Sequence, residues 1–171
     1  MKSQWTRSAL FSRKGGELSL SGAAVGQLLH AVLDKGVAFR FRVKGLSMHP
    51  FMRDEDVVTV FPLSHGCPSF GDVVAFVQPE TGKLALHRVI GKRGTYCLIK
   101  GDNIGEPDGF LPKEAIMGWV TLVEREGKRV ALCCGPEKSV IAFLSRTGLL
   151  THLFFPLWRF FRPLVRRTAI E

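Results

Sequence analysis

The sequence has few cysteines, and none of them shows the paired spacing that holds a metal ion. The four are Cys67, Cys97, Cys133 and Cys134, and no two form a CxxC pair. The neighbouring Cys133 and Cys134 are poorly placed for a simple disulfide within the chain. We therefore expect reduced, packed thiols, no zinc or other metal, and no bound cofactor.

Long uncharged apolar runs are also lacking. Residues 1–16 carry four lysines and arginines with no long apolar core behind them, which does not fit a secretory signal. In residues 139–167 the longest uncharged stretch is shorter than a bilayer span. We therefore expect the amino-terminal part to stay on the side of the membrane where it is made. There is also no internal repeat and no low-complexity tract.

Acidic residues are outnumbered, because 24 lysines and arginines stand against 15 aspartates and glutamates. The formal charge of +9 and the pI near 9.8 favour an anionic partner. Basic and aromatic side chains gather in the tail: Arg159, Arg162, Arg166 and Arg167 with Phe154, Phe155, Trp158, Phe160 and Phe161. This mixture predicts a peripheral membrane protein on the cytoplasmic side, with the tail in the lipid interface. Insertion of the tail and its packing on the protein body are the alternatives, and no nucleic acid is expected.

The apolar periodicity divides the chain into three parts. A lead-in, residues 1–36, contains helical spacing from residue 24 to residue 33 and a glycine just past its end. Short apolar or alternating runs follow at 39–43, 57–61, 73–77, 84–90, 96–99, 116–123 and 129–133. They predict a mainly β domain over 37–134, a coiled antiparallel sheet or partly closed barrel. Residues 135–171 return to a helical composition and form the basic amphipathic tail.

Ser47 is the candidate nucleophile. It lies in the segment GLSMHP, where glycine and proline predict a turn that presents the hydroxyl. A single serine in a turn is usually only a turn residue, so its surroundings decide. The segments that follow in order are LSMHPFMRDEDVVTV, FGDVVAFV, LALHRVIG, LIKGDN, EPDG and IMGWV.

This series resembles the signal peptidase family, which shares its fold with the self-cleaving LexA-like repressors. It is most similar to the subgroup in which histidine replaces the usual lysine base, and the similarity covers about residues 43–123. The resemblance implies that Ser47, in the SM-x-P segment, is the nucleophile and that His87, in HRV, is the base. It also implies acidic site residues at Asp102, in KGDN, and at Asp108 just beyond, with Asp108 favoured as the orienting carboxylate.

The chemistry of these residues is consistent with that assignment. A serine hydroxyl is a poor nucleophile until a base takes its proton, and histidine suits the task near neutral pH. An aspartate on the far ring nitrogen fixes the tautomer. The alternatives are a half-buried structural histidine at 87 and a turn aspartate at 102. His49 and His65 lie nearer to Ser47 in the sequence but fall in predicted loops.

Two features depart from the family pattern. Gly45 stands where most bacterial members have a serine that helps to hold the oxyanion, so the backbone N–H of Ser47 would have to serve. The predicted helix before Gly36 is too short and too polar to be the membrane-spanning anchor of typical members.

The sequence thus predicts a serine endopeptidase that cleaves an extended peptide, a preprotein leader or a signal sequence. The substrate would add to strand edges beside Ser47. The alternatives are a non-catalytic peptide-binding or membrane-associated β module and a LexA-like autoproteolytic regulator. The second of these requires a DNA-binding domain and a linker, for which the lead-in is too short.

Overall fold

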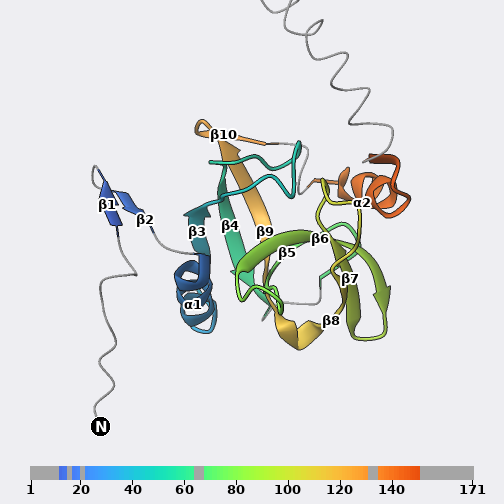
Figure 1. Ribbon diagram of the computed structural model, residues 1–171, viewed down its shortest axis with the longest axis horizontal. Coiled ribbons are helices and arrows are strands. Elements are labelled where there is room, and N and C mark those ends of the chain that lie inside the picture. Colours follow the sequence, from blue (N-terminus) through green and yellow to red (C-terminus); the bar gives the residue numbers. More distant parts are fainter. Residues whose placement is uncertain (1–11, 15–16, 20–21, 64–67, 131–134, 151–171) are drawn as a thin grey trace, which may run out of the picture.

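The computed structural model describes residues 12–14, 17–19, 22–63, 68–130 and 135–150. Their elements, in chain order, are the strands, helices and one short 3-10 helix (η3) seen in Figure 1: β1 (Ser12–Lys14), β2 (Glu17–Ser19), α1 (Gly22–Leu33), β3 (Phe39–Arg42), β4 (Val57–Pro62), β5 (Val73–Val77), β6 (Leu84–Arg93), β7 (Tyr96–Lys100), β8 (Gly109–Pro112), η3 (Lys113–Ala115), β9 (Ile116–Arg125), β10 (Lys128–Arg129) and α2 (Lys138–Arg146).

The protein is mainly β, as predicted. Eight strands form one antiparallel sheet in the order β3-β4-β9-β5-β6-β7-β8, with β10 paired to the end of β9. The sheet curls but does not close, and β3 and β8 end the order within the described part of the chain. The partly closed barrel of the sequence-based prediction is therefore an open, coiled sheet.

Alternating side chains build the core on both faces of the sheet. In β5, Val73 and Ala75 belong to one buried cluster, while Val74 and Phe76 belong to the other. This division follows from the two-residue period of a strand. Leu29 and Leu33 of α1 join the first cluster, so α1 packs on the β body and contacts β3, β6 and β9. In Figure 1, α1 and α2 lie at opposite ends of the sheet.

Several element boundaries differ from the sequence-based prediction. The lead-in was predicted as helical, but it also contains β1 and β2, which pair with each other. In this pairing Lys14 stands opposite Glu17, so only two residues of the sequence, Gly15 and Gly16, connect the two strands. β8 was missed because it is short and ends in a proline, which an edge strand tolerates.

The carboxy-terminal predictions are tested only in part. Of the expected strand at 129–133, Arg129 belongs to β10 and Val130 follows it, while residues 131–134 lie outside the described part. The expected helical tail begins as α2, while the arginine- and phenylalanine-rich residues 151–171 lie outside the described residues, as does His65. Within the described part, no helix combines the length and apolar character that crossing a membrane would require.

Candidate active site

Ser47 lies in a turn that begins directly after β3. Gly45 has a φ of 109°, a left-handed conformation that favours glycine, and its N–H donates to Asp54 Oδ1 at 2.7 Å. The following Leu46 is 60% exposed, and the side chain of Met48 is buried in the core. The turn is thus anchored by Met48 on one side of Ser47 while Leu46 projects into solvent.

The segment after β7 holds the Ser47 turn from the other side. The backbone N–H of Asn103 donates to the carbonyl oxygen of Ser47 at 2.7 Å, and its side-chain amide donates to the carbonyl oxygen of Leu46 at 3.1 Å. A Cβ added to Gly101 would come within 2.9 Å of the Ser47 carbonyl oxygen. The KGDN segment therefore positions the backbone of Leu46 and Ser47, a contact that the turn interpretation of this segment missed.

His87 sits on β6 and is 2% exposed. Its Nδ1 lies 2.6 Å from Asp108 Oδ2, and the ring meets Phe76 edge-on with centroids 5.6 Å apart. Because the carboxylate accepts a hydrogen bond, we assign the proton to Nδ1 and the lone pair to Nε2. A neutral imidazole in this tautomer is the form that accepts a proton from a hydroxyl.

Asp108 is fixed by two further contacts. Its backbone N–H donates to the carbonyl oxygen of Ile99 at 2.9 Å, just before β8 begins. Its second carboxylate oxygen lies 3.4 Å from Nε2 of Gln78, a residue that the sequence analysis did not single out. The side chain is 16% exposed. The structure thus brings Asp108 to His87, in the position expected for an orienting carboxylate.

Asp102 has a different partner. It forms a two-oxygen ion pair with Arg88, at distances of 2.7 to 3.1 Å, and both side chains are fully buried. Arg88 also donates to the carbonyl oxygen of Gly71. His87 and Arg88 are consecutive residues of one strand, so their side chains leave it on opposite sides. The structure does not bring Asp102 to the catalytic candidates but makes it part of a buried structural pair.

Ser47 and His87 line the same cavity, whose volume is about 470 Å³. Its apolar lining comes from α1, the end of β3 and the segment that follows it, β6, and the segment between β7 and β8: Val25, Phe41, Val43, Met48, Met52, Leu84, Ala85, Leu86 and Ile104. Among the described residues, neither the hydroxyl nor the backbone N–H of Ser47 has a hydrogen-bond partner. Both groups are available to a substrate, and catalytic hydrogen bonds commonly tighten only when substrate is bound.

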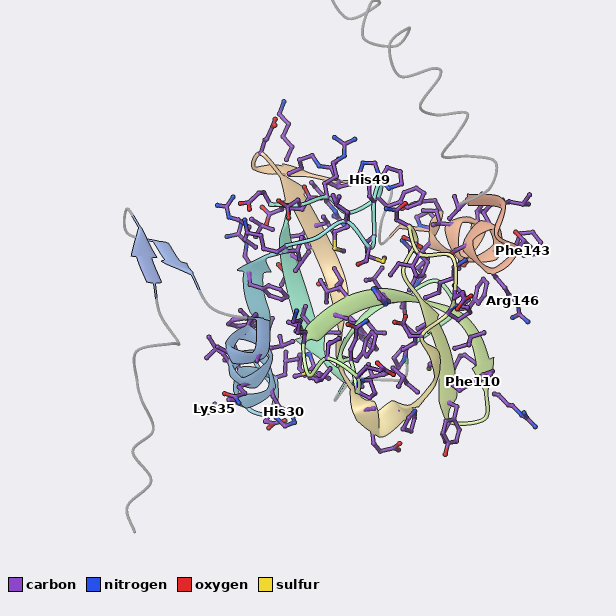
Figure 2. The ribbon with its side chains drawn as sticks, in the orientation of Figure 1. His30, Lys35, His49, Phe110, Phe143 and Arg146 are labelled. Atoms are coloured by element: carbon purple, nitrogen blue, oxygen red, sulfur yellow. The ribbon has the colours of Figure 1, made fainter. Side chains whose placement is uncertain are left out.

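The other candidates lie elsewhere. His49 is half-buried and is not among the residues that line the cavity, and Figure 2 shows it in the upper part of the view, toward β10. Cys97 is buried on β7, and the other three cysteines lie outside the described residues. No cluster of three possible metal ligands occurs among the residues that the structure describes.

A comparison of the chain with models of protein families and a second with curated proteins found no match.

Proposed function

We propose that the protein is a serine endopeptidase of the signal peptidase and LexA-like type, in the subgroup that uses histidine as the base. The observation that supports this most strongly is the contact between His87 Nδ1 and Asp108 Oδ2 at the wall of a cavity that also contains Ser47. A hydroxyl, an imidazole and a carboxylate in this relation are the parts of a Ser-His-Asp hydrolase, whatever their order in the chain.

In the proposed reaction the Ser47 hydroxyl attacks the carbonyl carbon of the scissile peptide bond. His87 Nε2 takes the hydroxyl proton as the C–O bond forms, and Asp108 stabilises the resulting imidazolium. Collapse of the tetrahedral intermediate breaks the C–N bond, and the imidazolium gives its proton to the leaving amine. A water molecule then attacks the acyl-enzyme ester, again with His87 as the base, and releases the acid product and Ser47.

The backbone N–H of Ser47 is the proposed donor to the oxyanion. It has no partner among the described residues, and an N–H group already in place stabilises negative charge at little reorganisation cost. Gly45 contributes no side-chain donor. Loss of one oxyanion donor typically costs about 10²–10³ in rate, so this site would be slower than one with a serine at that position.

Two unpaired strand edges border the cavity and suit an extended peptide. β3 is a terminal strand of the sheet, and its end at Phe41 and Arg42 lines the cavity. On the other side, residues 84–87 of β6 pair only with β5 in the described structure, because β7 begins to pair at Arg88. A peptide laid between these edges gains backbone hydrogen bonds and reaches Ser47 and His87 where the edges end.

Association with a membrane surface is the second part of the proposal, as expected for an enzyme that cleaves leader or signal sequences. The outer face of α2 exposes Val140 (62%) and Phe143 (58%). Lys138 pairs with Asp72 and Arg146 donates to the carbonyl oxygen of Ile90, so both of these cations hold α2 on the protein body. Figure 2 shows Phe143 and Arg146 on α2. The chain continues from there into the arginine- and phenylalanine-rich residues 151–171. An exposed apolar face followed along the chain by a segment rich in arginine and aromatic residues suits contact with a lipid interface.

The test is cleavage of a peptide library by the wild type beside Ser47→Ala and His87→Ala. Ser69→Ala is the matched control, since Ser69 is an exposed serine outside the cavity. We expect each site variant to lose about 10⁴-fold or more in turnover while the control keeps wild-type activity. Circular dichroism checks that all four proteins fold.

Unchanged cleavage by either site variant would remove that residue from the mechanism. Peptide binding without cleavage by the wild type would favour the non-catalytic peptide-binding module.

A further inference from the structure

Only basic residues contribute charge to the lining of the cavity. Four of them line it, Arg42, Lys44, Arg53 and Lys83, and no aspartate or glutamate does so. Carboxylates nevertheless lie close by: Glu55 pairs with Arg42, at 3.5 Å, and with Lys44, Asp54 accepts the Gly45 N–H, and Asp108 contacts His87. Lys83 has no carboxylate partner among the described residues. It therefore places a positive charge beside the apolar lining.

Lys83 lies at the end of the cavity away from the proposed base, because it comes four residues before His87, directly before β6. Arg42, in contrast, ends β3 on the side where the Ser47 turn begins. At about 3.3 Å per residue of strand, Lys83 stands roughly 13 Å along β6 from the base. The backbone carbonyl of Lys83 accepts the Gln78 N–H at 2.9 Å, which anchors the lysine at the closing turn of the β5–β6 hairpin.

We infer that the substrate peptide carries an acidic side chain about four residues from the bond that is cut, on the side that lies along residues 84–87. This inference rests on the proposed function and specifies its substrate class. The peptide backbone would pair with the edges of β3 and β6, its apolar side chains would contact the apolar lining, and the carboxylate would meet Lys83. Partly desolvated charge pairs of this kind contribute mainly to specificity.

A peptide fits this cavity better than a lipid headgroup. Over Leu84–His87, β6 pairs with β5 on one side, and on its other side no strand of the described part of the chain covers it. An extended peptide would satisfy both the N–H and the C=O groups of that edge. A headgroup phosphate would meet the cations alone and would leave the strand edges unpaired.

The experiment first identifies the bond that is cut in a library peptide. It then compares two pairs of matched peptides, which carry Glu or Gln four residues before the cut bond or four residues after it. The variant is Lys83→Glu. The control is Lys35→Glu, which makes the same charge change at an exposed lysine just past the far end of α1 and outside the cavity (Figure 2). The measured quantity is the ratio of kcat/KM for the Glu peptide to that for the Gln peptide.

We expect the wild type and Lys35→Glu to prefer the Glu peptide on one side of the cut by about five- to tenfold. High salt should reduce that preference. Lys83→Glu should abolish or reverse it. Cleavage of both peptides at equal rates by the wild type would overturn the inference and leave the proposed function standing.

If the wild type cuts neither peptide, the same pair is titrated against Ser47→Ala by fluorescence anisotropy. Tighter binding of the Glu peptide, lost in the Ser47→Ala/Lys83→Glu double variant, would support the inference although the proposed catalysis fails. Equal or absent binding would overturn it. If Lys83→Glu loses binding to anionic vesicles but keeps the preference for the Glu peptide, Lys83 contacts lipid and not the substrate. That result would also overturn the inference.

Discussion

At the scale of single residues, Asp102 and Asp108 have different partners because successive side chains of β6 point to opposite sides of the strand. His87 and Arg88 leave the strand on opposite sides, and each takes one carboxylate. The side chain of Asp108 keeps 16% exposure beside the cavity, whereas that of Asp102 has none. The two aspartates should therefore respond differently to the same conservative change.

Asp108→Asn is expected to lower kcat by about 10³–10⁴-fold, because an amide does not hold His87 in the required tautomer or stabilise its imidazolium. The free energy of unfolding should stay within about 1 kcal/mol of the wild type, since the side chain is partly exposed. Steady-state cleavage of the library peptide and urea unfolding measure the two effects. A variant that keeps wild-type kcat would remove Asp108 from the mechanism.

Asp102→Asn should behave in the opposite way. It leaves the Arg88 guanidinium buried opposite a neutral amide, and breaking a buried pair costs about 3–5 kcal/mol. We expect a large loss of stability in urea or thermal unfolding. At temperatures where the variant stays folded, its residual activity should exceed that of Asp108→Asn. Wild-type stability would contradict the structural role of Asp102.

The sequence alone singled out Ser47, His87 and Asp108, which the structure brings to one cavity and its wall, but not the residues that support them. Ser47 and His87 stand in local segments that carry a recognisable pattern, and a resemblance ranked Asp108 above Asp102. Gln78 and Asn103 were missed because each acts across a long sequence separation, on Asp108 and on the Ser47 turn respectively. No pattern in the neighbouring sequence predicts a contact between residues so far apart in the chain. Asn103 had only one signal, the polar side chain at the turn in KGDN.

At the scale of elements, β6 serves two functions along its length. Its first half, with an edge that no described strand covers, borders the cavity, and its second half pairs with β7 and supports α2. Arg146 donates to the carbonyl oxygen of Ile90 at 3.3 Å, and Lys100 of β7 donates to the carbonyl oxygen of Ser145 at 2.7 Å. Two cations from different elements therefore secure the carboxy-terminal end of α2 to the sheet.

Lys100 gives this attachment a pH dependence. Burial lowers the pKa of Lys100 below its usual 10.5, and the opposing effect of Asp102 does not fully offset the loss of solvation. Between the lowered pKa and 10.5 the unfolded chain binds the lysine proton more strongly than the folded chain does. Lys100 therefore costs stability at pH values below its folded pKa, and that cost disappears as the pH rises to 10.5.

Lys100→Met should remove this dependence. The free energy of unfolding of the wild type minus that of Lys100→Met is expected to increase as the pH rises from neutral toward 10.5. Urea unfolding at a series of pH values measures it, with the exposed Lys35→Met as a control that should parallel the wild type. A difference that does not change with pH would contradict the assignment.

At the scale of the whole molecule, the period-two runs of the sequence were sufficient to predict an antiparallel β body, but not the order of its strands. β9 lies between β4 and β5 in the sheet, although in the sequence it comes after β5, β6, β7 and β8. The register there depends on close approach at Gly118, where an added Cβ would overlap the Phe61 carbonyl oxygen. Such pairing between strands far apart in the chain depends on tertiary packing, which the pattern of a single sequence does not predict.

The two helices lie at opposite ends of the sheet, and only α2 leads into the basic aromatic tail. This arrangement leaves the cavity, bordered by α1 and the first half of β6, on a different part of the molecule from the proposed membrane contact. The proposed enzyme would therefore be held at the lipid surface without burying the opening through which a peptide enters.

Phe143→Glu is expected to weaken binding to vesicles that contain anionic lipids by about tenfold or more, because it replaces an apolar contact with a charge that the surface repels. Phe110→Glu is the matched control: Phe110 is 50% exposed but lies on β8 rather than α2 (Figure 2). Vesicle co-sedimentation at low and high salt measures the binding, which should fall with salt in the wild type. Equal losses in the two variants would show that α2 does not provide the contact, since a nonspecific charge effect would act on both. Loss in Phe143→Glu alone, with peptide cleavage in solution unchanged, would separate the membrane contact from the catalytic cavity.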